Sequence, residues 1–266
     1  GGGMKKVLII GANSYIGKGF YQYILTKYKD DIIVYKTSAS DDSWKNENLI
    51  NYDVVLMLSG IVHKKEKKSL EYIYDEVNHK LVVEIAKAAQ ESGVKQFIFM
   101  STAAVYGSNA EHITKYTIPN PTTYYGKSKL AAEKDIMKLK SDKFLVAVVR
   151  APMVYGEGCK GNYPRLVKLA GMVPVFPDIH NKRSMIHING LNKYLAMLIQ
   201  NEKSGIFHPQ DKDYVDTCNL VVNIRKSIGK NTWVTGAFNP VIFFLSRFIK
   251  SFHKMFSDYY YDKSLE

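Results

Sequence analysis

The first 150 residues alternate short apolar runs with longer segments in which apolar residues recur every three or four positions. Continuous apolar runs are typical of strands buried on both faces, whereas the recurring pattern is typical of amphipathic helices. Strands are predicted over residues 6–10, 31–35, 52–58, 97–100 and 144–149. Helices are predicted over residues 16–28, 69–91 and 125–139, the second with a stripe made of Ile73, Val77, Leu81, Ile85 and Ala88.

The pattern changes after Arg150, where glycine and proline become frequent and the predicted helices are short, 165–170 and 191–200. Strands that alternate with helices before that point predict an α/β fold with a Rossmann-like, doubly wound parallel sheet. We therefore assign residues 4–155 to a dinucleotide-binding Rossmann domain. Residues 156–266 are assigned to a smaller, irregular substrate-binding lobe that is intertwined with the first.

Composition narrows the class of protein. The chain has 266 residues, of which 46% are hydrophobic and 23% charged, and this balance is typical of a folded core. The longest apolar runs fall far short of the ~20 residues that cross a bilayer, and no signal-peptide pattern is present, so a cytoplasmic location is expected. Cys159 and Cys218 lie far apart and the histidines occur singly, so neither a disulfide framework nor a metal site is predicted.

Residues 11–17 form a glycine-bounded loop between the first predicted strand and the first predicted helix. Glycine at the first and seventh positions lets backbone N–H groups and the helix N-terminus face a pyrophosphate. Ser14 stands where a middle glycine would allow a closer backbone approach, and its hydroxyl can donate a hydrogen bond. An ordinary strand-to-helix turn is the alternative. The loop residues predicted to bind a dinucleotide are Gly11, Asn13, Ser14, Tyr15, Ile16 and Gly17.

Tyr125 and Lys129 are four residues apart at the start of a predicted helix, so their side chains share one face. A nearby cation favours the phenolate of a tyrosine whose ordinary pKa is ~10, so Lys129 is predicted to lower the pKa of Tyr125. A hydroxyl in the motif 101–107, which closes a predicted strand, can hold the substrate oxygen that Tyr125 protonates. The alternative is a surface aromatic residue with a solvated lysine, because 19 tyrosines make such spacings by chance.

These three motifs and the segment 150–156 occur in the order and spacing of the extended short-chain dehydrogenases that act on nucleotide sugars. The chain resembles that NAD-dependent epimerase/dehydratase family over nearly its whole length. The resemblance implies that Thr102 is the catalytic hydroxyl, that Tyr125 is the acid and base, and that Lys129 binds the nicotinamide ribose. It also implies cofactor contacts from Leu58, Ser59, Gly60, Asn78 and Pro152.

The two residues after Thr102 narrow the type of reaction. Dehydratases of the family carry an Asp-Glu pair there, whereas this chain has Ala103 and Ala104, so dehydration is not predicted. Several stretches resemble the capsule-biosynthesis reductases that form UDP-N-acetyl-D-fucosamine from a 4-keto precursor. They are residues 93–102, 120–124, 161–163, 181–184 and 207–211.

This closer resemblance implies NAD(P)H-dependent reduction of the C4 keto group of a UDP-2-acetamido-2,6-dideoxyhexos-4-ulose, to UDP-N-acetylfucosamine or UDP-N-acetylquinovosamine. The implied substrate contacts come from Thr102, Ala103, Asn162 and Arg183. Two alternatives stay open: a UDP-hexose or UDP-N-acetylhexosamine 4-epimerase, and a catalytically silent scaffold that senses the cofactor. Compared with the family, the chain ends early after Tyr261, which leaves open a missing substrate-binding element or a truncated C-terminus.

The end of the second predicted strand bears on the choice of cofactor. An acidic residue there normally accepts hydrogen bonds from the adenosine ribose. Here Lys36 takes that place, with Thr37 and Ser38 beside it. A cation and two hydroxyls favour the 2′-phosphate of NADP(H), with NAD(H) as the alternative if Asp41 or Asp42 reaches the ribose.

The net charge of +12 suits an acidic ligand, a membrane surface or nucleic acid, and the charge alone does not choose among them. No nucleic-acid-binding motif is recognisable, so that partner is not predicted. Residues 241–256 carry apolar residues on one helical face and cations on another. Such a helix either packs on its own domain or makes weak peripheral contact with an anionic membrane. A homodimer of the family type is compatible with the resemblance.

Overall fold

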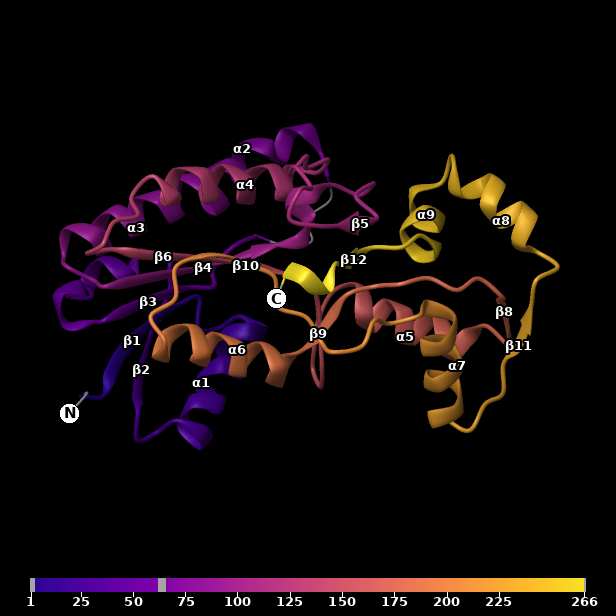
Figure 1. Ribbon diagram of the computed structural model, residues 1–266, viewed down its shortest axis with the longest axis horizontal. Helices are drawn as coiled ribbons and strands as arrows, with labels where there is room; N and C mark the ends of the chain where they lie inside the picture. The colour runs from indigo at the N-terminus through magenta and orange to yellow at the C-terminus, as the bar shows by residue number, and fades with distance from the viewer. Residues whose placement is uncertain (1–2, 62–65, 266) are drawn as a thin grey trace.

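The computed structural model describes residues 3–61 and 66–265. A six-stranded sheet has the strand order β10-β6-β4-β3-β1-β2, and every neighbouring pair in it is parallel. This arrangement confirms the predicted Rossmann-like fold (Figure 1). Its strands are β1 (Lys5–Ile10), β2 (Ile32–Thr37), β3 (Val54–Met57), β4 (Gln96–Thr102), β6 (Leu145–Ala151) and β10 (Gly205–Phe207).

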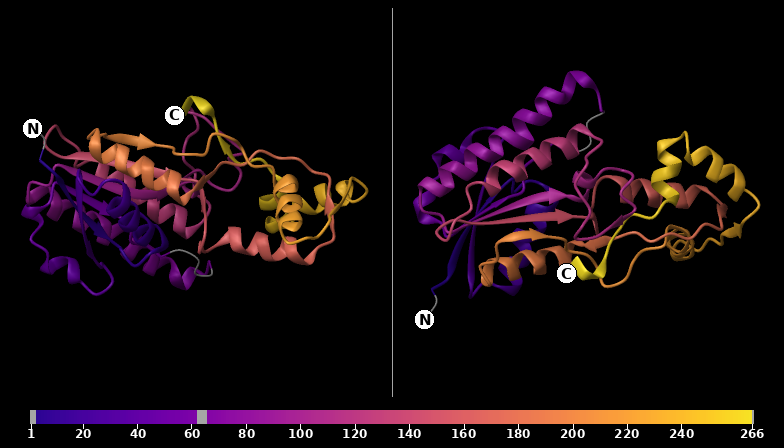
Figure 2. Two further views of the ribbon diagram at one scale, coloured as in Figure 1. Left: turned by 90° about the horizontal axis from the view of Figure 1, so that it is seen from below. Right: turned by 45° about the horizontal axis from the view of Figure 1, so that its top comes forward.

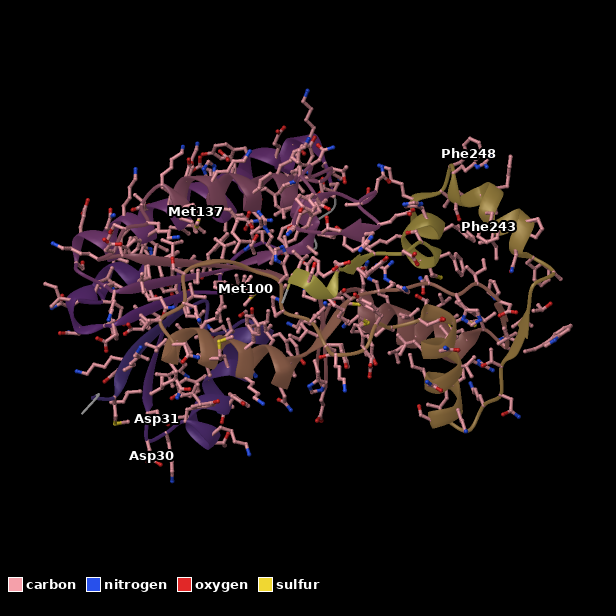
Figure 3. The ribbon with its side chains drawn as sticks, viewed as in Figure 1. Asp30, Asp31, Met100, Met137, Phe243 and Phe248 are labelled. Carbon is pink, nitrogen blue, oxygen red and sulfur yellow. The ribbon has the colours of Figure 1, made fainter. Side chains whose placement is uncertain are left out.

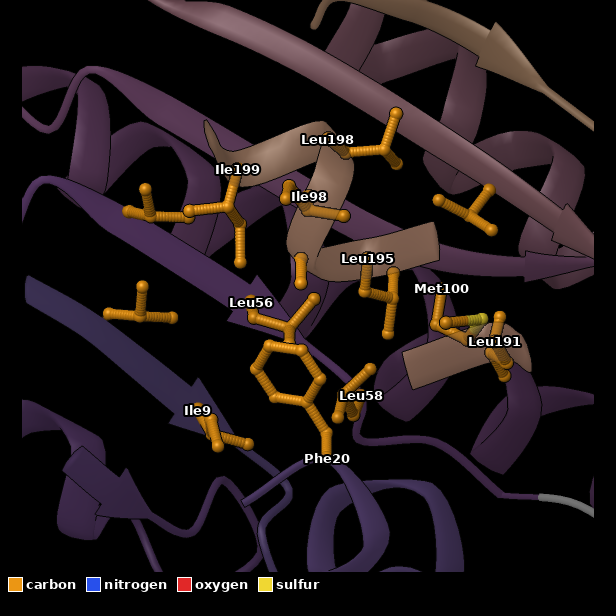
Figure 4. Close-up of a cluster of buried hydrophobic side chains, with 14 of the residues drawn as sticks. Ile9, Phe20, Leu56, Leu58, Ile98, Met100, Leu191, Leu195, Leu198 and Ile199 are labelled. Carbon is orange, nitrogen blue, oxygen red and sulfur yellow. The ribbon is translucent and has the colours of Figure 1, made fainter. Parts of the chain in front are cut away.

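Helices cover both faces of the sheet (Figures 1 and 2). On one face lie α1 (Tyr15–Lys27) and α6 (Ile188–Gln200), and on the other lie α2 (Glu71–Asp75), α3 (Leu81–Glu91) and α4 (Tyr124–Met137). Figure 4 shows the first of the two cores, where Phe20 of α1 and Leu195 of α6 pack against Leu56 of the sheet. Central strands buried on both faces explain why their sequences are almost entirely apolar.

The chain returns to the first lobe after residue 156. Helix α6 packs on the sheet with Leu191, Leu195 and Ile199 fully buried, and β10 then joins the sheet beside β6. Residues 188–207 therefore belong in space with the Rossmann sheet, as expected if the lobes 4–155 and 156–266 are intertwined. The boundary between the two lobes stays a prediction.

Two predicted elements differ from the structure. Strand β2 is at the edge of the sheet and is only partly buried, because no strand lies beyond it. The segment predicted as one helix over 69–91 is α2 and α3 joined by a π-helical turn, Glu76–Lys80. The buried stripe is shifted by one residue from the predicted one, both before and after this turn. Within the predicted stripe only Ile85 is buried, and the buried residues are Tyr74, Asn78, Val82, Ile85, Ala86 and Ala89.

The second lobe extends from the carboxyl edge of the sheet to the far end of the molecule (Figure 1). Its core joins helices α5, α7, α8 and α9 through buried residues that include Phe176, Ile242 and Phe256. The bounds are α5 (Asn162–Met172), α7 (Thr217–Ser227), α8 (Asn239–Ser246), α9 (Lys250–Phe256), β8 (Val175–Pro177) and β11 (Trp233–Thr235). Short strand pairs join the lobes: β5 (His112–Ile113) with β12 (Tyr260–Tyr261), and β7 (Met153–Tyr155) with β9 (Met185–His187).

The single helix expected over 241–256 is in fact two, because α8 ends at Ser246 and α9 begins at Lys250. The break lets Ile242 and Phe256 both reach the same small core. Among the helices in the described ranges, none has the length and apolar character needed to cross a membrane.

His79 links the two helices on one face of the sheet. Its Nδ1 lies 2.8 Å from Asp75 Oδ1 and its Nε2 lies 2.7 Å from Asp135 Oδ2 of α4. Burial acts to lower the pKa of His79, but the hydrogen bonds and charges of both carboxylates together raise it above the ordinary 6.5. The protonated ring therefore stabilises the folded state more than the neutral ring does.

This linkage predicts a pH-dependent stability. The contribution of His79 should be complete below pH 6.5 and should be lost as the pH rises through the raised folded-state pKa. Urea unfolding of the natural chain and of His79→Gln should differ by at most about 1 kcal/mol near pH 6, and by less at pH 9. A difference that stays constant or grows between these pH values would contradict the assignment.

Candidate active site

The loop after β1 is tight, and two glycines make it so. Gly11 has φ of +93°, and a Cβ on it would lie 2.6 Å from the backbone nitrogen of Ser59. A Cβ on Gly17 would lie 2.5 Å from the carbonyl oxygen of Gly11. Both positions therefore exclude any larger residue, and the first turn of α1 stays close to the carboxyl end of the sheet. That is the geometry in which a helix N-terminus can face a phosphate.

Ser14 compensates for the missing middle glycine. It is the N-cap of α1: its Oγ accepts from the backbone N–H of Gly17 at 3.0 Å and donates to the carbonyl of Gly11 at 2.8 Å. The loop is thus held closed by the serine side chain. Asn13 is exposed, Ile16 is half-buried, and Tyr15 donates from its hydroxyl to the carbonyl of Glu157 in the second lobe, at 3.1 Å.

The glycine loop follows β1, the strand from which the sheet is extended in both directions. β1 lies between β2 and β3, and ligands of doubly wound sheets bind outside the strand ends at such a switch point. The amide of Leu58 donates to the carbonyl of Ile10 at 2.8 Å, which places Ser59 beside Gly11. Pro152, also predicted to contact the cofactor, is buried directly after β6.

Asn78 holds the segment after β3. Its Oδ1 accepts from the amide of Ile61 at 2.7 Å, and its Nδ2 donates to the carbonyl of Ile61 at 3.1 Å and to Ser128 Oγ at 3.2 Å. The residue is fully buried in the π-helical turn, a local form that is frequent at functional sites. Asn78 therefore ties the Ser59–Gly60 loop to α4, the helix that carries Tyr125.

Thr102 and Tyr125 meet at the carboxyl end of β4. Thr102 is the last residue of that strand, and Tyr125 lies in the first turn of α4, which Thr123 caps by accepting from the amide of Gly126 at 3.0 Å. Burial raises the pKa of Tyr125 to about 12, although its hydrogen bond with the Thr102 side chain acts in the opposite direction. At neutral pH the phenol is therefore protonated, which is the form that a proton donor needs.

Lys129 lies one turn further along α4 and is only 4% exposed. Its Nζ donates to the carbonyl of Met100 at 3.0 Å and lies 5.9 Å from the centre of the Tyr125 ring. Burial lowers the pKa of Lys129 to about 8, and Glu133 offsets part of this effect. The pKa of Tyr125 is thus raised overall, with burial as its main cause. The effect of Lys129 on Tyr125 stays a prediction.

The residues at this edge fit a nicotinamide dinucleotide. An ammonium group has three N–H donors, and in the described ranges the Lys129 amine has one hydrogen-bond acceptor, the carbonyl of Met100. Two donors are thus left for ribose hydroxyls. Ser101 Oγ, next to Thr102 in β4, is buried and has no hydrogen-bond partner within the same ranges.

The end of β2 is next to the glycine loop, since the amide of Gly11 donates to the carbonyl of Thr37 at 3.1 Å. The Thr37 hydroxyl lies 3.2 Å from Ser43 Oγ. Lys36 is exposed and extends over α1, where its Nζ lies 4.4 Å from the centre of the Tyr21 ring. Asp41 accepts from the amide of Ser43 at 3.1 Å and so stabilises its own turn.

Arg183 is linked by Tyr259 to the segment that follows Thr102. The hydroxyl of Tyr259 lies 2.9 Å from the carbonyl of Ala103 and 3.0 Å from that of Gly107, and the Arg183 guanidinium carbon lies 5.9 Å from the centre of its ring. Arg183 also donates to the carbonyl of Lys254 at 2.7 Å. Asn162 is the first residue of α5, and nothing in the described contacts joins it to this group.

Three cationic side chains lie close enough to affect one another: Arg183, Arg165 and Lys254. Of these, only Arg183 was predicted from the sequence. Burial together with the charges of Arg183 and Arg165 lowers the pKa of Lys254. Within the described ranges none of the three forms an ion pair with a carboxylate, although the charge of Asp258 acts on Arg183. Tyr259 was missed too. The only signal for Arg165 was its place after the Asn162 segment.

Known proteins resemble this chain over most of its length. The model of the NAD dependent epimerase/dehydratase family matches residues 7–208. A UDP-glucose 4-epimerase from Vibrio cholerae is 29% identical over 254 residues, covering 86% of this chain and 77% of that protein. The N-acetyl-alpha-D-glucosaminyl-diphospho-ditrans,octacis-undecaprenol 4-epimerase of Escherichia coli O157:H7 is 24% identical, covering 84% and 72%. The crystal structure of a dTDP-4-dehydrorhamnose reductase from Clostridium acetobutylicum shares the fold, with a TM-score of 0.70, 23% identity and coverage of 86% and 82%.

Proposed function

This chain belongs to the NAD-dependent epimerase/dehydratase family, and from that premise we propose that it is a nucleotide-sugar 4-keto reductase. The substrate proposed is a UDP-2-acetamido-2,6-dideoxyhexos-4-ulose, and the product is UDP-N-acetylfucosamine or UDP-N-acetylquinovosamine for surface polysaccharide. The observation that carries the proposal is that Tyr125 is buried and hydrogen-bonded to Thr102, while Ala103 and Ala104 follow Thr102 in the chain. Elimination of water would need an additional acid and base at those alanine positions.

When bound, the reduced nicotinamide supplies the hydride. Thr102 holds the carbonyl oxygen of the sugar, and Tyr125 donates the proton to that oxygen as charge develops on it. Lys129 is fixed by Met100 and binds the nicotinamide ribose. A reduction consumes the neutral phenol, which is the form favoured by a pKa of about 12.

The substrate diphosphate would lie against Arg183, Arg165 and Lys254. Like charges so close together repel one another, and a diphosphate would relieve that repulsion. The planar guanidinium of Arg183 suits phosphate oxygens because two of its N–H groups can bind them in parallel.

A 4-epimerase is the second candidate, supported by the similarity to two 4-epimerases over most of both chains. The test is incubation with UDP-4-keto-6-deoxy-N-acetylglucosamine and reduced cofactor, with products identified by NMR. The proposal expects one equivalent of cofactor to be oxidised per sugar reduced. Interconversion of UDP-N-acetylglucosamine and its C4 epimer without net cofactor use would favour the epimerase. Cofactor binding without either reaction would favour the silent scaffold.

The cofactor is proposed to be NADPH rather than NADH. With Lys36, Thr37 and Ser38 at the end of β2, one charge-assisted contact to the 2′-phosphate should favour NADPH by about 1.5–3 kcal/mol in kcat/KM. Lys36→Ala should remove most of this preference and leave NADH kinetics almost unchanged. Lys27→Ala, which removes a lysine at the far end of α1, is the matched control. Equal use of the two cofactors by the unmutated chain, or a preference for NADH, would contradict the proposal.

A further inference from the structure

Helix α8 presents a large apolar surface to solvent at the end of the molecule farthest from the sheet (Figures 1 and 3). We define the α8 face as Val241, Phe243, Phe244 and Phe248, which are 57%, 56%, 58% and 71% exposed. The helix packs on its own lobe through Ile242, which is 7% exposed, on the opposite side. A helix that serves only its own domain carries polar residues on its outer side. Here the outer side of α8 carries Phe243 and Phe244, and Phe248 follows directly after the helix.

The charged residues within α8 and α9 all have the same sign. Residues 239–256 contain Arg247, Lys250 and Lys254 and no aspartate or glutamate. Arg247 and Lys250 are exposed, and neither forms an ion pair within the described ranges. By helical spacing Arg247 lies between Phe243 and Phe244 on the exposed side. Unpaired cations within an apolar surface call for a partner that is both apolar and anionic.

We propose that the α8 face binds the surface of an anionic phospholipid membrane. The phenylalanines would enter the boundary between headgroups and acyl chains, while Arg247 and Lys250 contact lipid phosphates. The eight residues of α8 span only about 12 Å, so the helix lies along the surface and does not cross the bilayer. This proposal is independent of the reaction proposed above.

A second copy of the chain fits this surface less well. In a two-fold contact the same residues meet themselves, so Arg247 and Lys250 of both copies would approach with no acidic residue of α8 or α9 to pair with them. The net charge of +12 adds repulsion between the copies. An anionic lipid surface instead attracts every one of these cations.

The test is flotation of the full chain with vesicles of phosphatidylcholine that contain increasing phosphatidylglycerol. Binding should rise with the anionic fraction, be weak on pure phosphatidylcholine and fall with salt. Phe244→Ser with Phe248→Ser should lower the partition coefficient at least about tenfold. Arg247→Ser with Lys250→Ser should lower it about fivefold per charge removed. All four side chains are exposed, and thermal melting confirms that each variant is folded.

Ile50→Ser with Tyr72→Ser is the matched control, since these side chains are 72% and 69% exposed and lie in the first lobe. This variant should bind vesicles as the unmutated chain does. The proposal is overturned if no vesicle composition retains the chain, or if the α8 variants bind as well as the control. It is also overturned if light scattering shows a dimer that Phe244→Ser with Phe248→Ser disperses, because a second copy then covers the face.

Discussion

Replacing Tyr125 with phenylalanine should lower turnover of the keto-sugar by about 10²-fold or more, the range typical of a general acid. The substitution removes the hydroxyl that bonds to Thr102 and leaves the ring, so packing at the start of α4 is kept. Affinity for the cofactor should therefore change little. Single-turnover rates with saturating keto-sugar, together with cofactor titration by fluorescence, measure the two quantities separately.

Tyr124→Phe is the matched control for this prediction, because Tyr124 is the preceding residue in the same helical turn. Its activity should be close to normal. Lys129→Ala should damage turnover and cofactor affinity together, since the amine is placed to serve both. Near-normal turnover in Tyr125→Phe would refute the assignment of Tyr125 as the general acid, and Tyr124 would then be the next candidate to test.

The parts of the fold that the sequence predicts well are those with a strong local pattern. Strands β1, β3, β4 and β6 contain continuous apolar runs, and such runs are typical of parallel strands that helices cover on both faces. The loop 11–17 can be predicted because a Cβ on either of its end glycines would clash with nearby backbone atoms. The end of a predicted strand and the four-residue spacing in a helix suffice to predict that Thr102, Tyr125 and Lys129 lie at the carboxyl edge of the sheet.

The remaining features depend on contacts between distant parts of the chain. The π-helical turn at Asn78 has no local apolar signal, and it arises where a buried amide side chain ties the loop after β3 to Ser128 of α4. The pKa of Tyr125 depends on how deeply the phenol is buried, which spacing alone does not give. Tyr259 and Ala103 are 156 residues apart in the sequence, so no local motif predicts the hydrogen bond between them.

The second large effect concerns a buried ion pair between Glu133 of α4 and Arg150 of β6. Arg150 Nη2 lies 2.8 Å from Glu133 Oε2, and its Nε donates to Oε1 at 3.0 Å, with the side chains 8% and 3% exposed. Arg150 also donates to the Tyr106 hydroxyl at 2.7 Å. Burial lowers the pKa of His208 to about 4, so its neutral ring can accept from that hydroxyl at 2.6 Å.

Glu133→Ala should lower the free energy of unfolding by about 3–5 kcal/mol, because it leaves the Arg150 charge buried without a counter-ion. The loss is a large share of the ~5–15 kcal/mol by which folded domains are stable. Glu202→Ala is the contrast. Glu202 contacts Lys5 and Lys95 at 3.0 and 2.8 Å, but its side chain is 38% exposed, so its removal should cost about 1 kcal/mol or less.

The double variant Glu133→Leu with Arg150→Met separates two quantities. One is the net contribution of the ion pair to stability, and the other is the destabilisation caused by leaving one buried charge unpaired. Neither buried charge is then left unpaired, and the Tyr106 hydroxyl keeps His208 as its acceptor. The double variant should therefore be more stable than Glu133→Ala alone, a non-additivity that urea unfolding of all variants can measure. If Glu133→Ala and Glu202→Ala cost the same, burial does not set the energy of the pair. If the double variant is the least stable, the ion pair itself, and not the avoidance of an unpaired charge, holds α4 against β6.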